Sequence, residues 1–553
     1  MDARESRIAI RLLPSLADFA FLIPMVLCFG MMDGVKLLLA DGDTGWHIRT
    51  GDWILAHGAV PRQDIFSFSK PGQPWYAWEW LTDVIWAGLH KCGGLALVTL
   101  ASMLLISISF TIVFYAARRK SNPIVALAVT MVAAACSSLH WLARPHLFTL
   151  LFLAVFCAVL ERVRSGQERA GRIPYLALLP LAMVAWTNLH GGWFVGIVTV
   201  GAYGAGELAK MAAAPARAER LAAGRRAAKY LACAVACGCA TLVNPYSYHL
   251  HAHVARYLKD PYLAAHIIEF FPLNFHHPMG LFFELLLVLG AMAAFWHLAQ
   301  GRFIEPIVIL GWGHTALFAA RNMPIFAIAS APFIAAAVQE WLDVAPELNV
   351  AGWLKGAARS FNAVSAEMAE TDSIPRWRVA SVAGALVLAA LLYAPNPPAN
   401  FRAAFNPKQF PARALEALRG NPDARVFASD QWGDYLIYRL YPRARVYTDG
   451  RSDYYGSEFG IRTLDAQNAQ HNWERVLKAY QIDTVLLPPA TPLAGALKES
   501  NRWRLEYDDG VALIFRPAAL AASRTSSQGK SRDREITKTE ASDRTITKKK
   551  PTS

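Results

Sequence analysis

The feature of this sequence that most limits its fold is a series of long apolar stretches, about eleven in all, each near the length that crosses a lipid bilayer. A backbone in lipid must satisfy its own hydrogen bonds, which favours helices. With 54% hydrophobic and only 18% charged residues, the chain is too apolar for a soluble protein of 553 residues. We therefore expect an all-α polytopic membrane bundle of about 11 transmembrane helices. The stretches are residues 15–33, 94–117, 121–140, 147–163, 174–190, 193–212, 228–244, 279–300, 303–320, 323–341 and 379–395.

The loops between these stretches alternate in charge. Basic loops at 118–120, 161–172, 213–229 and 355–378, together with Arg302, all fall on the side of the N-terminus. The positive-inside rule makes that side cytoplasmic. We therefore expect a multi-pass protein of a bacterial-type inner (cytoplasmic) membrane with a cytoplasmic N-terminus. The net charge of +13 reflects these loops and a basic tail, so no nucleic-acid partner is expected.

The opposite loops collect polar side chains. The first outer loop, residues 41–90, is rich in tryptophan and carboxylates and is expected to carry interfacial helices, and later outer loops add histidines and arginines. Polar residues near helix ends are costly to expose to lipid, so they tend to face a cavity or one another. Their convergence from several helices favours a site at the outer face.

A soluble segment follows the last apolar stretch and the breaker cluster Pro395-Asn396-Pro397-Pro398. Residues 1–398 are thus interpreted as the transmembrane domain and 399–517 as a small C-terminal α/β domain, which an odd number of spans would place in the periplasm or outside the cell. Residues 518–553 have the composition of a disordered basic tail. Strands are predicted at 425–429, 445–448, 484–487 and 511–515, and helices at 432–440 and 473–480.

Two carboxylates, Asp41 and Asp43, come directly after the first membrane helix and lie two residues apart. In an extended turn they point the same way. Such a pair can hold a divalent cation such as Mg or Mn, or one carboxylate can act as general base toward a hydroxyl. A solvated Asp-Gly turn at the membrane surface is the alternative.

Glu79 and Asp83 lie four residues apart among several tryptophans, and share one face if residues 78–90 are helical. An interfacial belt accounts for the tryptophans but not for the carboxylates beside them. A binding surface for a polar head group beneath a lipid tail accounts for both.

Arg144 stands between His140 and His146 at the outer end of the third helix, and Pro145 forces a break there. The guanidinium of Arg144 can clamp a phosphate through its fork of donors, and Arg321 can do the same from across the bundle. A snorkelling or structural role is the alternative for each arginine.

Taken together, these features resemble the C-type glycosyltransferase superfamily, which includes the protein mannosyltransferases, the lipid A aminoarabinose transferase and bacterial transferases of lipopolysaccharide-core sugars. The resemblance covers residues 15–345 as architecture. It rests on the acidic pair after the first helix, the tryptophan-rich interfacial helices and the outer soluble domain, and on these stretches: Asp43-Thr44-Gly45-Trp46-His47, Pro74-Trp75-Tyr76-Ala77-Trp78-Glu79-Trp80-Leu81, Ala143-Arg144-Pro145-His146, Trp186-Thr187-Asn188-Leu189-His190-Gly191-Gly192 and Asn244-Pro245-Tyr246.

The resemblance implies that an acid of the first outer loop is catalytic, and Asp43 matches that position best, with Asp41 next. Many relatives have Asp-Glu where this chain has Asp43-Thr44, which leaves open both the choice of acid and the need for a metal. The implied reaction is inverting transfer of a hexose or pentose from a polyprenyl-phosphate-linked donor to an envelope glycan, lipid or protein acceptor.

The resemblance also implies roles for the other polar residues of the outer face. Asp43 would deprotonate the acceptor, Arg144 and Arg321 would neutralise the departing phosphate, and His146 or His190 would orient it. Glu79 and Asp83 would contribute to substrate binding.

Two other functions fit a polytopic protein with polar outer loops: a transporter and a non-catalytic scaffold of envelope assembly. Transporters tend to place charges and broken helices near the bilayer midplane and to show repeated halves. This sequence has no internal repeat, and its mid-helix positions are almost uncharged. A glycosyltransferase is therefore favoured, with the sugar and the acceptor left open.

Overall fold

The computed structural model describes residues 10–349, 351–419 and 423–518, so all but the first residue of the predicted tail 518–553 lies outside the described residues. The chain forms two compact units. The first comprises Met1–Gln63 and Pro74–Phe405, and the second comprises Asp64–Gln73 and Asn406–Ser553. The second unit therefore includes a short segment of the first outer loop, which the sequence did not indicate.

The first unit is a helical bundle, and every predicted apolar stretch contains a helix. Within the described residues, six helices are long and apolar enough to cross a membrane and three more apolar helices are shorter. The polytopic helical fold is thus confirmed, while the count of about eleven spans stays a prediction. The helices are α2 (Leu16–Val26) with its continuation η1 (Leu27–Met31), α5 (Trp80–Ala117), α6 (Pro123–Ser137), α7 (His146–Arg164), α8 (Tyr175–Leu189), α9 (Phe194–Ala213), α10 (Arg217–Ala240), α13 (Gly280–Ala299), α14 (Ile304–Phe318), α15 (Met323–Val344) and α17 (Val379–Leu392).

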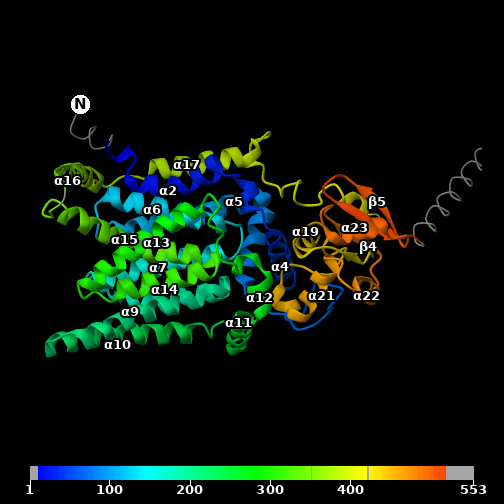
Figure 1. Ribbon diagram of the computed structural model, residues 1–553, viewed down its shortest axis with the longest axis horizontal. Helices are drawn as coiled ribbons and strands as arrows, with labels where there is room; N and C mark the ends of the chain where they lie inside the picture. Colours follow the sequence, from blue (N-terminus) through cyan, green and yellow to red (C-terminus); the bar gives the residue numbers. More distant parts are fainter. Residues whose placement is uncertain (1–9, 350, 420–422, 519–553) are drawn as a thin grey trace, which may run out of the picture. The chain divides into compact units, whose positions relative to one another are not determined.

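Shorter elements complete this unit. Figure 1 shows α6, α7, α13, α14 and α15 side by side, with α4, α11 and α12 gathered at one end of the bundle. That end carries the polar loops described below. The added elements are α3 (Val35–Leu38), α4 (Asp43–His57), α11 (Tyr248–Lys259), α12 (Pro261–His266), α16 (Gly352–Ser373) and the single-turn helices η2 (Ser138–His140), η3 (Gly191–Trp193), η4 (Ile268–Phe270), η5 (Ala320–Asn322) and η6 (Ala399–Phe401), with a two-stranded ribbon of β1 (Arg169–Ala170) and β2 (Ile173–Pro174).

Glycines set the geometry of α4 and α5. A Cβ on Gly51 of α4 would lie 1.9 Å from the carbonyl oxygen of Asp83 and 2.6 Å from the Cβ of Ala87, so only glycine lets the two helices approach this closely. Helix α5 is interrupted at Gly93 and at Gly94, whose φ is +64°. This kink separates the interfacial part of α5 from its apolar part, as the separate sequence predictions for residues 78–90 and 94–117 require.

The second unit has α/β character, as predicted. Its sheet has the order β3-β4-β6-β5, with β3 parallel to β4 and the other pairs antiparallel. The strands are β3 (Val426–Phe427), β4 (Thr484–Leu487), β5 (Trp503–Asp508) and β6 (Leu513–Pro517), and the helices are α18 (Leu415–Arg419), α19 (Asp430–Leu440), α20 (Ser452–Tyr455), α21 (Ser457–Gln467), α22 (Trp473–Ala479) and α23 (Pro492–Glu499).

The strands differ from the sequence predictions at two places. Residues 445–448 do not form a strand of this sheet: Val446 makes a single parallel bridge to Ser67. Strand β5 was not predicted, because most of its side chains are exposed and it lacks the apolar alternation of a buried strand.

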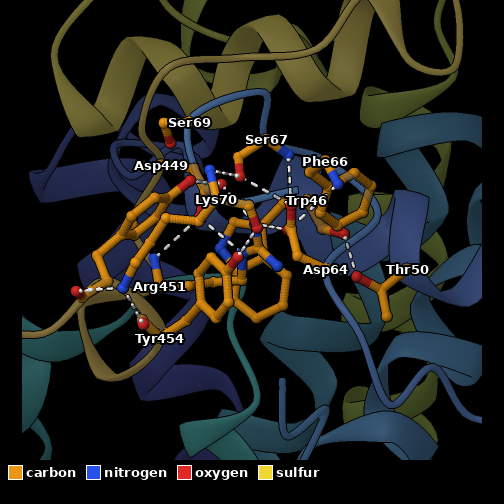
Figure 2. Close-up of polar contacts among 12 residues, drawn as sticks. Trp46, Thr50, Asp64, Phe66, Ser67, Ser69, Lys70, Asp449, Arg451 and Tyr454 are labelled. Carbon is orange, nitrogen blue, oxygen red and sulfur yellow. Dashed lines mark hydrogen bonds and ion pairs between the residues drawn. The ribbon is translucent and has the colours of Figure 1, made fainter. Parts of the chain in front are cut away.

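The loop segment 64–73 is held inside the second unit by a buried charge cluster, shown in Figure 2. The guanidinium of Arg451, whose side chain is 1% exposed, lies 2.7 Å from both the Asp64 and the Asp449 carboxylates. The Ser69 hydroxyl donates to the Tyr447 carbonyl at 2.5 Å, and the Lys70 amine donates to the Tyr455 carbonyl at 2.8 Å. The segment is therefore an integral part of the C-terminal unit.

Candidate active site

The polar residues of the first unit converge where several helices begin or end. Asp43 is the first residue of α4, and Glu79 directly precedes α5. Arg144 lies just before α7, and Glu269 lies in the single turn η4. Each side chain is thus carried on a helix terminus or a tight turn at the same end of the bundle.

Three carboxylates surround Arg144. Its Nη1 lies 2.7 Å from Asp41 Oδ2 and 2.6 Å from Glu269 Oε1, and its Nη2 lies 2.8 Å from Asp43 Oδ2. Burial acts to lower the pKa of Arg144, but the charges of Asp41, Asp43 and Glu269 outweigh it and raise that pKa well above its ordinary value. With all three acids ionised, the group carries two negative charges in excess. We call these four residues the Arg144 cluster.

Glu269 is ionised in this cluster. Burial acts to raise the pKa of its carboxyl, but the positive charge of Arg144 outweighs burial and lowers that pKa below its ordinary value. Sequence reasoning found no partner for Glu269. Only the fold shows that η4 brings it to Arg144, which lies 125 residues earlier in the chain.

The two acids of the first outer loop have different bonding. Asp41 Oδ1 accepts a hydrogen bond from the backbone N–H of Asp43 at 2.8 Å, while its Oδ2 pairs with Arg144. One oxygen of Asp41 therefore closes the turn at the start of α4, and the other holds Arg144. Asp43 binds Arg144 through Oδ2 and is 6% exposed.

A second group joins two histidines to Glu79. His47 Nδ1 lies 2.6 Å from Asp83 Oδ1, and His47 Nε2 lies 3.5 Å from Glu79 Oε2. The other Glu79 oxygen lies 3.3 Å from His190 Nε2. Sequence reasoning missed His47, although it lies one helical turn after Asp43 and therefore on the same face of α4.

Hydrogen bonds fix the tautomer of His190. Its Nδ1 accepts from the backbone N–H of Gly192 at 3.0 Å and lies 2.7 Å from the Thr149 hydroxyl. That hydroxyl also accepts from Trp186 Nε1 at 2.9 Å, so its own hydrogen points to His190. The ring hydrogen of His190 must then sit on Nε2 and point toward Glu79.

Both histidines are neutral near pH 7. Burial, followed by the charge of Arg144, lowers the pKa of His47 well below its ordinary value. Burial, followed by the charges of Arg321 and Arg144, lowers the pKa of His190 to about 3. The neutral imidazole of His190 therefore orients the Glu79 carboxylate through Nε2, and the ring of His47 lies against the other Glu79 oxygen.

Arg321 differs from Arg144 in its surroundings. Its guanidinium carbon lies 4.5 Å from the ring centroid of Phe270, next to Glu269 in η4. Within residues 10–349, 351–419 and 423–518, no carboxylate lies within 4.0 Å of the Arg321 guanidinium. Arg321 is thus a cation beside the Arg144 cluster without an ion pair in the described part of the chain.

The remaining predicted site residues are more enclosed. His146 Nε2 lies 2.7 Å from the carbonyl oxygen of His140, which closes the turn before α7. The His146 ring centroid lies 6.4 Å from that of His190. The Asp83 side chain is 1% exposed and contacts His47. Direct contact of Asp83 or His146 with a substrate stays a prediction.

The tryptophans of the first outer loop join the loops of this end to one another. Trp80 Nε1 donates to Asn188 Oδ1 at 2.8 Å, and Trp86 Nε1 donates to the Ala143 carbonyl at 2.9 Å. The Ala143 carbonyl also accepts from the Thr44 hydroxyl at 3.1 Å. These contacts set the positions of the Arg144 cluster and the histidines.

Comparison with known proteins supports the fold. No family model and no curated protein matches the sequence. The structure is similar to that of the archaeal oligosaccharyltransferase AglB from Archaeoglobus fulgidus in complex with an inhibitory peptide and a dolichol-phosphate, with a TM-score of 0.52 and 12% identity over 91% of this chain and 74% of that chain. A structure of the Archaeoglobus fulgidus oligosaccharyltransferase in the apo form has a TM-score of 0.51 and 11% identity over 85% of this chain and 69% of that chain.

A further match is ArnT from Cupriavidus metallidurans in the apo state, with a TM-score of 0.43 and 14% identity over 90% of this chain and 97% of that chain. The likeness to AglB shows the fold of the chain. It agrees with the architecture that the sequence resemblance implies.

Proposed function

We propose that this protein is an inverting membrane glycosyltransferase. It moves a sugar from a polyprenyl-phosphate-linked donor to an envelope glycan, lipid or protein acceptor at the outer face of the inner membrane. The observation that carries the proposal is the Arg144 cluster, in which two carboxylates of the first outer loop lie at one end of the bundle. Beside it stands Arg321, which has no ion pair with a described residue. The fold supports it, since a protein of the same fold has been solved with a dolichol-phosphate.

In the proposed reaction, the acceptor oxygen or nitrogen attacks C1 of the sugar from the face opposite the phosphate. The bond from C1 to the phosphate oxygen breaks, and the acceptor proton passes to a carboxylate. Asp43 is the preferred base because both oxygens of Asp41 already serve the start of α4 and Arg144. A positioned base of this kind contributes about 10²–10⁴-fold to the rate.

The leaving phosphate gains negative charge and needs a positive partner. Arg321 suits this role because no described carboxylate within ion-pairing distance competes for its guanidinium. Arg144 is already surrounded by three acids, so its contact with the phosphate requires that some of that negative charge be offset.

A divalent cation would offset the excess negative charge around Arg144, and the residues present there fit such a cation. The donors are all carboxylate oxygens, which Mg and Mn prefer, and oxygens of Asp41 and Asp43 lie within 4.8 Å of each other. Asp41 and Asp43 would hold the cation, which would supply positive charge for the phosphate. Glu79, oriented by His190 and lying beside His47, would accept hydrogen bonds from substrate hydroxyls.

The test compares three near-isosteric variants in cells that lack the native protein. Asp43→Asn keeps the shape and removes the basicity, so it should abolish glycosyl transfer at unchanged protein level. Asp41→Asn should reduce transfer less, because an amide oxygen can still accept from the Asp43 backbone. Glu79→Gln should act mainly on substrate binding.

Glycosyl transfer is quantified as the amount of envelope glycan product, measured by mass spectrometry. Near-full transfer by Asp43→Asn with loss in Asp41→Asn would move the base to Asp41. Full activity in both variants would refute the proposed function.

A further inference from the structure

At the end of the bundle opposite the Arg144 cluster, a groove of about 580 Å³ runs between α5 and α7. Helix α7 begins beside Arg144 and ends at Arg164, a length of roughly 28 Å, which is close to the hydrocarbon thickness of a bilayer. The groove therefore lies at the level of the other membrane leaflet, on the side of the basic loops.

The two helices present matching faces to this groove. On α5 and its end, Ile112, Ala116 and Arg119 follow one another at helical spacing. On α7, Val155, Ala158, Val159 and Arg162 do the same. Residues three, four and seven apart share one helix face, so each wall is apolar along its length and ends in an arginine. The alanines leave room for a chain between the walls.

Arg118, Arg119 and Arg162 line the groove, and the last two have only neutral hydrogen-bond partners among the described residues. Arg162 donates to the Tyr175 hydroxyl at 3.0 Å, and Arg119 donates to Gln167 Oε1 at 3.4 Å. In the part of the chain that the structure describes, neither guanidinium has a carboxylate within 4.0 Å. Burial, followed by the charge of Arg162, lowers the pKa of Arg119, so the two cations disfavour each other.

Neighbouring basic residues behave differently. The Lys120 amine lies 2.7 Å from Glu161, and Arg118 lies 2.6 Å from Asp372. Among the described arginines that line this apolar groove, Arg119 and Arg162 thus differ from Arg118 in having no carboxylate partner. An anion with an attached hydrocarbon chain would complement both the charge and the walls.

We propose that this groove binds one anionic phospholipid of the leaflet on the basic side. Its phosphate lies between Arg119 and Arg162, and one acyl chain lies along Ile112, Val155 and Ala158. The stretch from Ile112 to Arg119 gives the chain roughly 10 Å of wall. The site is separate from the proposed transferase site and does not depend on it.

Native mass spectrometry of the purified full chain in a neutral detergent tests the proposal. Phosphatidylglycerol and phosphatidylethanolamine, which differ in charge, are titrated in parallel. The double variant Arg119→Gln/Arg162→Gln should weaken phosphatidylglycerol binding roughly thirtyfold, because each arginine at an anionic headgroup contributes about fivefold.

Two further variants provide controls. Arg217→Gln/Arg220→Gln removes the same charge from the exposed start of α10 and should leave binding unchanged. Ala158→Phe fills the groove while keeping both arginines, and should also release the lipid. If the Gln pair fails to fold, Ala158→Phe still tests the site.

Equal binding of the two lipids, or equal weakening by the α10 variant, would overturn the proposal in favour of ordinary lipid contact. Competition by inorganic phosphate at lipid concentration would also overturn it, because the acyl chain would then contribute nothing. Selective retention of phosphatidylglycerol that both groove variants abolish would support it.

Discussion

Replacing Arg144 with glutamine should destabilise the protein, because it removes the one positive charge that three carboxylates share. Their distances to the guanidinium are 2.6–2.8 Å, and their side chains are 8–24% exposed. Removing one partner of a buried ion pair costs about 3–5 kcal/mol, and partial exposure places this case at about 2–3 kcal/mol. Glutamine fits the space but cannot neutralise the acids.

The assay is denaturant unfolding of the purified chain in micelles at pH 7.5, followed by tryptophan fluorescence. Arg49→Gln is the matched control, since its pair with Asp52 is 27% and 36% exposed and should contribute less than about 1 kcal/mol. Adding Glu269→Gln to Arg144→Gln removes one unpaired charge and should restore at least about 0.5 kcal/mol.

The pH dependence has a definite sign. Burial acts to raise the pKa of Glu269, but the charge of Arg144 has the larger effect and lowers it. Ionised Glu269 therefore stabilises the native protein at pH values above its ordinary pKa of 4.5. That contribution is lost as the pH falls through the native pKa. The difference in the free energy of unfolding between the native protein and Arg144→Gln should therefore become smaller below pH 4.5. If Arg144→Gln is as stable as Arg49→Gln and gains nothing from Glu269→Gln, Arg144 does not stabilise the fold through these acids.

Three other predictions follow from the same structure. Arg321→Gln should leave stability nearly unchanged, because the lost contact is to Phe270 and not to a carboxylate. It should lower transfer by about 10²–10³-fold, measured as product per protein. In the C-terminal unit, Arg451→Met should cost about 3–5 kcal/mol and expose the segment 64–73 to protease, whereas Arg462→Gln, from an exposed pair, should do neither. The native pKa of His190 is about 3 and its ordinary value is 6.5, so the unfolded state binds more protons between these two pH values. The free energy of unfolding should therefore decrease as the pH is lowered from 6.5 toward 3. His190→Gln should make the thermal unfolding midpoint less dependent on pH from 7 to 5.

Much of the helical fold could be predicted because membrane helices leave a local signal. About 20 apolar residues in a row require a helix whatever the rest of the chain does. The kink at Gly93 and Gly94 in α5 falls between the two segments that the sequence treats separately, residues 78–90 and 94–117. The grouping of Asp41, Asp43 and Arg144 followed from topology alone, because all three lie at loop ends on one side of the bundle.

The features that were missed depend on long-range pairing. Glu269 contacts Arg144 across 125 residues, and nothing in the local sequence of η4 reveals that partner. The segment 64–73 reaches the C-terminal unit through Arg451, which lies 387 residues after Asp64. Such contacts depend on the tertiary fold, and their partners cannot be identified from a single sequence.

The most direct test of the proposed transferase is mass analysis of lipid-linked sugars and envelope glycans in a strain that lacks this protein. If the protein is this transferase, one polyprenyl-phosphate-linked sugar accumulates while one envelope glycan, lipid or protein loses that same sugar. Native protein should reverse both changes, and Asp43→Asn should reverse neither. Unchanged levels of all lipid-linked sugars together with intact envelope glycans would contradict the account.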